Sequence, residues 1–391
     1  MEYQYCTTCL SLSSRPRVTF NDEGVCSACQ WVEAKKMVVD WKARWQELEA
    51  LCDRFRCKDG SDWDVIVPCS GGKDGSYVAW KMKHDLGMHP LCVTLLPQYQ
   101  TEVGRQNLKN FKKSGFDHIT ITPNPVVYKK LAIKGFKEQG RPKLPFVTGI
   151  STAVIKLAMK FDIPFVMYGE EGEVEYGGTM EYANRAEMDR EYLVKYSYSG
   201  YDTVAYLDEF TRDDLKWWLL PGQEEMAKTN LLPTSWSYFE NWDPELHANL
   251  AKEKCGLQTV KGVSAGTFTD YAQLDDVLQD LHAYMMFVKF GFGRALSDAA
   301  IEIRAGRMTR EEGVENVKKL DGVFPEKYLP AFLDYFGMTE AEFWSIVDSW
   351  VHKDLLEKCG GRWKLKTTAV KGLERGGKFE IGAKQHAETK I

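Results

Sequence analysis

An α/β fold built on a parallel sheet, with a small cysteine-rich unit before it and a helical region after it, is predicted by three features of the sequence. Strand-like apolar runs alternate with helix-like stretches between about residues 60 and 180. Two Cys-x-x-Cys pairs stand within the first 35 residues, and a mostly helical pattern runs from Tyr271 to Val370. Such alternation favours a parallel sheet whose ligands bind beyond the carboxyl ends of the strands.

The cysteine pairs are the first element along the chain. Cys6-x-x-Cys9 and Cys26-x-x-Cys29 are separated by 16 residues, which is the spacing of two knuckles that fold around one tetrahedral ion. Four thiolates fill the coordination sphere of zinc and leave no position for water. The pattern therefore predicts a structural Zn²⁺ site rather than a redox or iron–sulfur centre.

A helical stretch from Val32 to Phe55 follows, and the β-α alternation then begins at the apolar run Val65-Ile66-Val67. That strand ends in a glycine-rich turn, and a helix over Tyr77–Leu86 comes next. The further strands are expected over Leu91–Leu96, His118–Thr122 and Pro164–Tyr168, and the further helices over Gly104–Lys113, Val126–Glu138 and Thr152–Phe161.

The glycine-rich turn is predicted to bind phosphate. Its sequence is Ser70-Gly71-Gly72-Lys73-Asp74-Gly75-Ser76. Glycines let the backbone N–H groups approach an anion, and the following helix adds its positive end. The Walker A pattern is absent, so transfer of a γ-phosphate is not indicated.

Ser-Gly-Gly-x-Asp after a buried strand resembles the signature of the PP-loop ATP pyrophosphatases over roughly residues 60–180. The resemblance implies an adenine nucleotide alpha hydrolase-like fold and cleavage of ATP to AMP and pyrophosphate. Gly75 departs from the commonest form, in which Ser follows Asp directly, and leaves open whether Ser76 contacts phosphate.

Two charged segments are candidates for the rest of the site. Glu170 and Glu171 follow the Pro164–Tyr168 strand and, with Asp74, are candidates to hold Mg²⁺ or orient the nucleophile. Lys289 and Arg294 flank a Gly-Phe-Gly turn between helical runs and are candidates to bind pyrophosphate or the phosphates of a substrate.

The chain divides into five predicted parts. They are a zinc knuckle (1–35), a PP-loop domain (36–181), an accessory or inserted region rich in aromatic residues (182–262), a helical region (263–370) and a mobile tail (371–391).

The whole set of motifs resembles the N-acetyl sugar amidotransferases of bacterial surface-polysaccharide and flagellin-sugar pathways. The resemblance is carried by the cysteine pairs and by VPCSGGKDGSY (67–77), MYGEEGE (167–173), GTFTDYAQLDD (266–276) and KFGFGRA (289–295). It implies a role in lipopolysaccharide or O-antigen synthesis, in which ATP activates an acetamido group of a UDP-linked sugar and ammonia converts it to an acetamidino group.

Ammonia is expected from a separate glutaminase. The first cysteine is Cys6, and no cysteine has glycine on both sides, so neither main type of glutaminase nucleophile is present. The resemblance adds a barrel subunit that would channel the ammonia.

Composition argues against nucleic-acid and membrane partners. The 391 residues carry a net charge of -5 with both signs interleaved, and no signal peptide or long apolar span is evident, which makes the cytoplasm the expected location. One alternative hypothesis is a tRNA thiolation enzyme. Sulfur transfer would need a reactive cysteine near the predicted ATP site, where only Cys69 lies, and the acidic balance disfavours tRNA. Another alternative is a zinc-containing scaffold whose phosphate loop is only a remnant.

Overall fold

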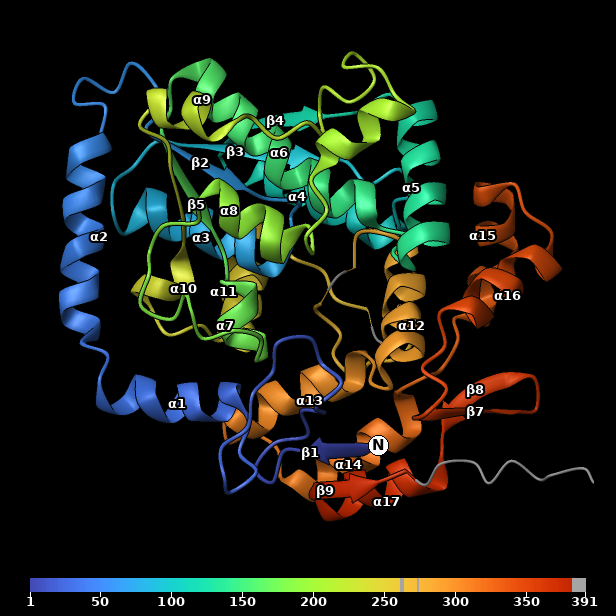
Figure 1. Cartoon of the computed structure of the whole chain (residues 1–391). Helices are drawn as coiled ribbons and strands as arrows, with labels where there is room; N and C mark the ends of the chain where they lie inside the picture. The colour runs from blue at the N-terminus through green and yellow to red at the C-terminus, as the bar shows by residue number, and fades with distance from the viewer. Residues whose placement is uncertain (261–263, 273, 382–391) are drawn as a thin grey trace, which may run out of the picture.

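The computed structural model describes residues 1–260, 264–272 and 274–381. Five parallel strands form its main sheet in the order β4-β3-β2-β5-β6 (Figure 1). They are β2 (Val65–Pro68), β3 (Pro90–Leu95), β4 (Asp117–Ile121), β5 (Phe165–Tyr168) and β6 (Leu232–Ser235). The chain changes direction across the sheet between β2 and β5, which is where ligands bind in open α/β sheets.

Helices cover both faces of this sheet, because successive strand residues point into two different apolar clusters. Val65 and Val67 face one cluster and Ile66 faces the other. The first cluster is completed by α2 (Trp41–Phe55), α3 (Lys73–His84), α4 (Glu102–Lys113), α10 (Trp236–Phe239) and α11 (Pro244–Cys255), and the second by α5 (Pro125–Gln139) and α6 (Leu144–Phe161). Burial on both faces explains the continuous apolar runs of the strands.

Helix α6 is the one helix among the described residues that is long and apolar enough to cross a membrane. Its residues Ala153, Val154 and Leu157 pack in the cluster that contains Ile66 of β2. This packing accounts for its apolar composition, so α6 is a core helix of the sheet.

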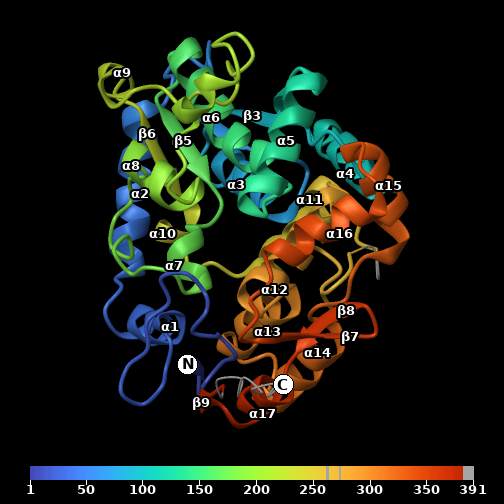
Figure 2. The same ribbon diagram turned by 45° about the vertical axis from the view of Figure 1, so that its right-hand side comes forward.

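The C-terminal part forms a separate apolar core. Its elements are α12 (Leu278–Phe290), α13 (Arg294–Arg304), α14 (Arg310–Leu320), α15 (Leu329–Phe336), α16 (Glu340–Ser349), α17 (Thr367–Arg375), β7 (Leu356–Cys359), β8 (Arg362–Leu365) and β9 (Gly377–Glu380). Helices α15 and α16 lie beside α5 (Figure 2), where Phe136 packs against Phe336 and Phe343.

Short elements complete the fold. They are β1 (Glu2–Tyr5), α1 (Ser27–Met37), α7 (Gly172–Tyr176), α8 (Arg190–Tyr192), a π-helical turn (Leu193–Ser197), α9 (Gln223–Lys228) and two 3-10 turns (Thr203–Asp208 and Glu326–Tyr328). Strand β1 pairs antiparallel with β9, which joins the two ends of the described chain.

The structure corrects the predicted boundaries in three places. The helix expected from Val32 to Phe55 is two helices, since Asp40 caps α2 by accepting from the Ala43 N–H at 2.9 Å. The region 182–262 is not an insertion, because it supplies β6 and α11 to the sheet domain.

The third correction concerns the tail. Residues 371–381 are structured, with Leu373 and Phe379 buried and β9 paired to β1. The apolar residues of this Gly- and Lys-rich segment are widely spaced, so the sequence pattern did not predict the helix and strand found there. Residues 382–391, Gln273 of the 266–276 motif and the predicted boundary at 262/263 lie outside the described residues.

Candidate active site

A cavity of about 290 Å³ lies beyond the carboxyl ends of β2 and β5, between the sheet domain and α12 and α13. Of the predicted residues, Ser70 to Gly75, Glu170 and Arg294 line it. Sequence reasoning assigned no role to six further polar lining residues, namely Asn107, Lys143, Tyr176, Tyr271, Asp275 and Gln279, although Tyr271 and Asp275 lie in the 266–276 motif.

Glycine lets the turn after β2 come close to its neighbours. Gly71 has φ +83°, and a Cβ there would stand 2.7 Å from the backbone carbon of Asn107. A Cβ at Gly75 would lie 2.6 Å from the Pro68 carbonyl oxygen. Helix α3 can therefore pack this closely against the end of β2 only because residue 75 is glycine. The unusual Gly75 is therefore explained by packing.

Helix α3 begins at Lys73, with Gly72 as its N-cap. The N–H groups of the first helical turn have no carbonyl partner inside a helix and are available to an anion. These N–H groups belong to Lys73, Asp74 and Gly75, which line the cavity. The positive end of the helix dipole lies at the same place and would also favour an anion.

Ser76 stands apart from the other loop residues. It is fully buried, its Oγ lies 3.8 Å from the Cys69 Sγ, and it does not line the cavity. The structure thus turns this hydroxyl toward the core and leaves Ser70 as the hydroxyl of the loop.

Asp74 is surrounded by donors. Its Oδ1 accepts from His247 Nδ1 at 2.8 Å and from Trp242 Nε1 at 3.2 Å, and its Oδ2 pairs with the Lys73 ammonium. Burial alone would raise the pKa of Asp74, but Lys73 and His247 outweigh it and hold the pKa well below its usual range. Asp74 is therefore an ionised anchor for Lys73.

His247 and Trp242 are site residues that sequence reasoning missed. His247 is fully buried, stacks on Tyr77 at 3.8 Å between ring centroids, and lies 173 residues from Asp74 along the chain. Because a carboxylate only accepts, His247 Nδ1 carries the proton toward Asp74. Nothing in the sequence around 247 links it to the loop.

The two predicted glutamates have different surroundings. Glu170 lines the cavity, and no described side chain donates a hydrogen bond to it. Burial, and then the charge of Asp74, raise the pKa of Glu170 to about 7. Glu171 instead caps α7, accepting from the Val174 N–H at 2.6 Å and from the Tyr192 hydroxyl.

The carboxylates do not form a preorganised Mg²⁺ site. Both oxygens of Asp74 and of Glu171 already accept hydrogen bonds, so of the three predicted Mg²⁺ ligands only Glu170 is unoccupied. Among the described residues, the one group of three or more potential metal ligands is the cysteine set. Mg²⁺ at this cavity would be held largely by phosphate oxygens and water, which is its common mode in nucleotide sites.

The wall opposite the phosphate loop carries two cations that are already paired. Lys143 Nζ lies 2.8 Å from Gln279 Oε1 and 3.3 Å from Asp276 Oδ2, and Arg294 Nε lies 2.8 Å from Asp298 Oδ1. Burial would lower the pKa of Arg294, but Asp298 outweighs it and raises the pKa. This wall therefore offers oriented polar groups with little net charge.

Lys289 is not brought into the cavity. Its Nζ donates to the Gln139 carbonyl at 2.6 Å and lies over the Trp350 ring. Gly291, with φ +73°, ends α12 and turns the chain so that Lys289 and Arg294 point to different surroundings. The two predicted cations thus do not act as one clamp.

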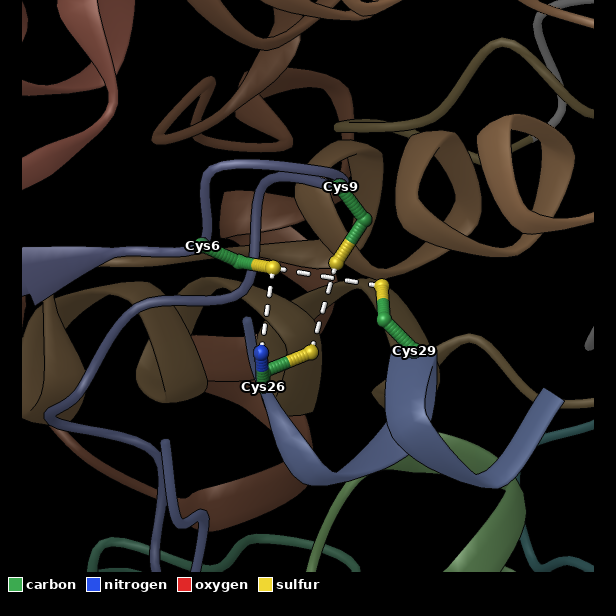
Figure 3. A group of neighbouring side chains, drawn as sticks. All are labelled: Cys6, Cys9, Cys26 and Cys29. Carbon is green, nitrogen blue, oxygen red and sulfur yellow. Dashed lines mark hydrogen bonds between the residues drawn. The ribbon is translucent and has the colours of Figure 1, made fainter. Parts of the chain in front are cut away.

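The four predicted zinc ligands converge (Figure 3). The Sγ atoms of Cys6, Cys9, Cys26 and Cys29 are buried and all lie within 4.8 Å of one another. The separations are 3.9 Å for Cys6–Cys29 and 3.5 Å for Cys9–Cys26, against about 3.8 Å for thiolates around a tetrahedral zinc ion. The Cys26 N–H also donates to Cys6 Sγ at 3.2 Å. This donor set fits zinc.

The knuckle holds the segment that follows β5. Arg17 forms a bidentate pair with Glu173, and Ser27 Oγ lies 3.3 Å from the carbonyls of Gly177 and Gly178. Buried Lys35 pairs with Glu175 at 2.9 Å. The knuckle therefore fixes the segment that presents Glu170 and Tyr176 to the cavity.

The parallel sheet, the Ser-Gly-Gly-Lys-Asp loop after β2 and the helix that follows it agree with the α/β fold that the sequence predicts. Residues 265–369 match the family described as LPS biosynthesis protein WbpG-like, C-terminal domain. The lining residues Tyr271, Leu274, Asp275, Gln279 and Arg294 lie within this matched range.

Other comparisons add little. None of the curated proteins matches the chain. Among solved structures, NMN synthetase from Francisella tularensis is similar at 13% identity, over 69% of this chain and 94% of that chain, with a TM-score of 0.28. At this score the likeness does not establish a shared activity.

Proposed function

We propose that this protein is an AMP-forming amidotransferase that converts an acetamido group of a UDP-linked sugar into an acetamidino group. The observation that carries the proposal is the shared cavity. One wall is the predicted phosphate loop, and the opposite wall includes Gln279 and Arg294 from the residues that match a WbpG-like domain of LPS biosynthesis proteins. ATP and nucleotide sugars are cytoplasmic metabolites, so we place the reaction in the cytoplasm.

In the first step the amide oxygen of the sugar bonds to the α-phosphorus of ATP. The bond from that phosphorus to the bridging oxygen breaks, and pyrophosphate leaves with the electron pair. The N–H groups at the start of α3 and the Lys73 ammonium are positioned to stabilise the charge that builds on the phosphates. Ser70 is the loop hydroxyl that faces the same cavity.

In the second step ammonia bonds to the activated carbon, the carbon–oxygen bond breaks, and AMP leaves with the electron pair. The attacking nitrogen must lose a proton. Glu170 is the base we assign, because a carboxyl with a pKa of about 7 can accept a proton at neutral pH. Its ionised form would also pair with a cationic amidine product.

We further propose that ammonia comes from a separate glutaminase with a channelling barrel subunit. Besides the knuckle, Cys52, Cys69, Cys92 and Cys255 are buried. The two thiols that reach solvent, Cys57 and Cys359, lie outside the cavity. Neither has the sharp glycine elbow of a glutaminase nucleophile.

The thiolation hypothesis is disfavoured by the state of Cys69. This thiol is 2% exposed, and burial raises its pKa to about 12, so it is neutral at physiological pH. A sulfur carrier beside an ATP site needs a reactive thiolate. The remnant-scaffold hypothesis is disfavoured by the complete set of interactions around Asp74.

The experiment is to incubate the chain with ATP, isotope-labelled ammonium and a panel of UDP-acetamido sugars, with mass spectrometry of the sugar and analysis of the nucleotide. We expect one labelled nitrogen in place of oxygen, with AMP and pyrophosphate as co-products. Glutamine alone should give no product. Release of ADP, or glutamate formation by the chain alone, would contradict the proposal.

A further inference from the structure

A second cavity, of about 320 Å³, lies on the knuckle side of the first. It is formed by α1, the segment before α11 and the end of α13. Its lining includes Val32, Lys36, Trp41, Trp242, Ala305 and Arg307. None of the residues that line it also lines the first cavity.

Two aromatic side chains separate the cavities. Trp242 lines the second cavity, while its Nε1 donates to Asp74 of the first at 3.2 Å. Glu175 lines the second cavity, and the next residue, Tyr176, lines the first. The rings of Tyr176 and Trp242 lie 5.5 Å apart between centroids. The two rings therefore stand between the cavities, with Trp242 beside Asp74.

The pairing of charges in the second cavity favours ammonia over ammonium. Its two lining carboxylates are already paired with cations, Glu175 with Lys35 at 2.9 Å and Asp243 with Arg307 at 2.8 Å. The remaining lining cations also have partners, since Lys36 pairs with Glu33 and Arg304 lies beside the Cys9 thiol. Such a lining offers ammonium no free anionic partner and admits a small neutral molecule.

The chemistry of the proposed function requires a separate route for the nucleophile. The reacting ends of ATP and the sugar must meet in the first cavity, and the remainder of both molecules then obstructs its mouth. Water that reached the activated carbon would regenerate the amide and waste ATP. We infer that ammonia enters through the second cavity and reaches the activated carbon between Tyr176 and Trp242. This inference rests on the proposed function.

The test is to fill the second cavity without touching the first. Ala305 is exposed at the end of α13, and Val32 is half-buried in α1. Ala305→Trp and Val32→Phe would each narrow the second cavity from a different helix. If one variant fails to fold, the other still tests the inference. Ala341→Trp is the matched control, because Ala341 is exposed in α16 and lines neither cavity.

Three quantities are measured with ammonium chloride as the nitrogen source. They are sugar-dependent exchange of labelled pyrophosphate into ATP, the KM for ammonia, and the ratio of amidine formed to AMP released. We expect exchange at wild-type rates in all variants. The KM for ammonia should rise about tenfold or more in Ala305→Trp and Val32→Phe, with a lower ratio of amidine to AMP and no change in the control.

An unchanged KM for ammonia in both folded variants would overturn the inference while leaving the proposed function intact. Absence of sugar-dependent exchange in the wild-type protein would overturn the proposed function, and the passage with it. Loss of exchange in the two variants alone would also overturn the inference, since it would show that the second cavity supports ATP or sugar binding.

Discussion

The two walls of the first cavity are built in different ways. The phosphate loop comes from six consecutive residues, Ser70 to Gly75, whose binding groups are backbone N–H groups and one lysine. The opposite wall collects Lys143, Gln279 and Arg294 from three separate helices, and its cations are neutralised by buried partners. If the proposed function holds, ATP binding is a local property of one segment, whereas recognition of the sugar depends on how the two parts of the chain pack.

The largest effect should come from Asp74 on the loop wall. Asp74→Asn removes the charge that anchors Lys73 and accepts from His247 and Trp242. In Asp74→Asn we expect kcat to fall about a thousandfold with little change in the melting temperature. In Ser70→Ala we expect kcat to fall as well. Asp334→Asn, at an exposed position of α15, is the control. Wild-type turnover in both loop variants would remove the loop from the chemistry.

Glu170→Gln tests the segment between the two walls. With hydroxylamine as the nucleophile, kept at a saturating concentration of its neutral form at each pH, product formation by the wild type should rise through pH of about 7 as Glu170 ionises. A carboxyl with a raised pKa is protonated below that pH and cannot act as a base. Glu170→Gln should lower the rate of product formation at high pH about a hundredfold and should abolish its rise near neutral pH. Glu253→Gln, on the surface of α11, should retain it.

The opposite wall should show a smaller, substrate-specific effect. Arg294→Lys keeps the charge beside Asp298 but loses the planar fork. We expect the KM for the sugar to rise about tenfold while the KM for ATP stays within about twofold of the wild type. Arg362→Lys, in an exposed pair with Glu326, is the matched control. An equal rise in both KM values would mean that Arg294 serves ATP as well.

Loss of zinc should act through the segment that the knuckle holds. Cys29→Ser removes one of the four predicted zinc ligands. We expect zinc content to fall and the melting temperature to drop by several degrees, before turnover at the phosphate loop is affected. Cys359→Ser, at an exposed thiol, should change neither quantity. Metal analysis and calorimetry are the measurements. Iron with a visible charge-transfer band would reject the zinc assignment.

The smallest effect is expected at Lys289. It lies outside the cavity and is held by the Gln139 carbonyl and the Trp350 ring. Lys289→Met should leave kcat and both KM values within about twofold of the wild type. A large loss of turnover with normal stability would bring the turn at 289–294 back into the site as one unit.

Sequence alone predicted the features that a short stretch determines. The β-α alternation, the glycine-rich turn before a helix and the convergence of the four cysteines are confirmed, because strand periodicity, glycine turns and ligand spacing each act over a few residues. Binding of phosphate and of zinc at these places stays a prediction. The family match at residues 265–369 agrees with the resemblance drawn from the motifs.

Only the tertiary structure decided which distant side chains meet. His247 and Trp242 reach Asp74 from the segment at 242–247, and Lys143 meets Gln279 across the domain boundary. Ser76 and Lys289 carry suitable chemistry but point elsewhere, because helix phase at α3 and the turn at Gly291 set their directions. A motif fixes residue types and spacing, whereas the direction of a side chain depends on the packing of the element that carries it.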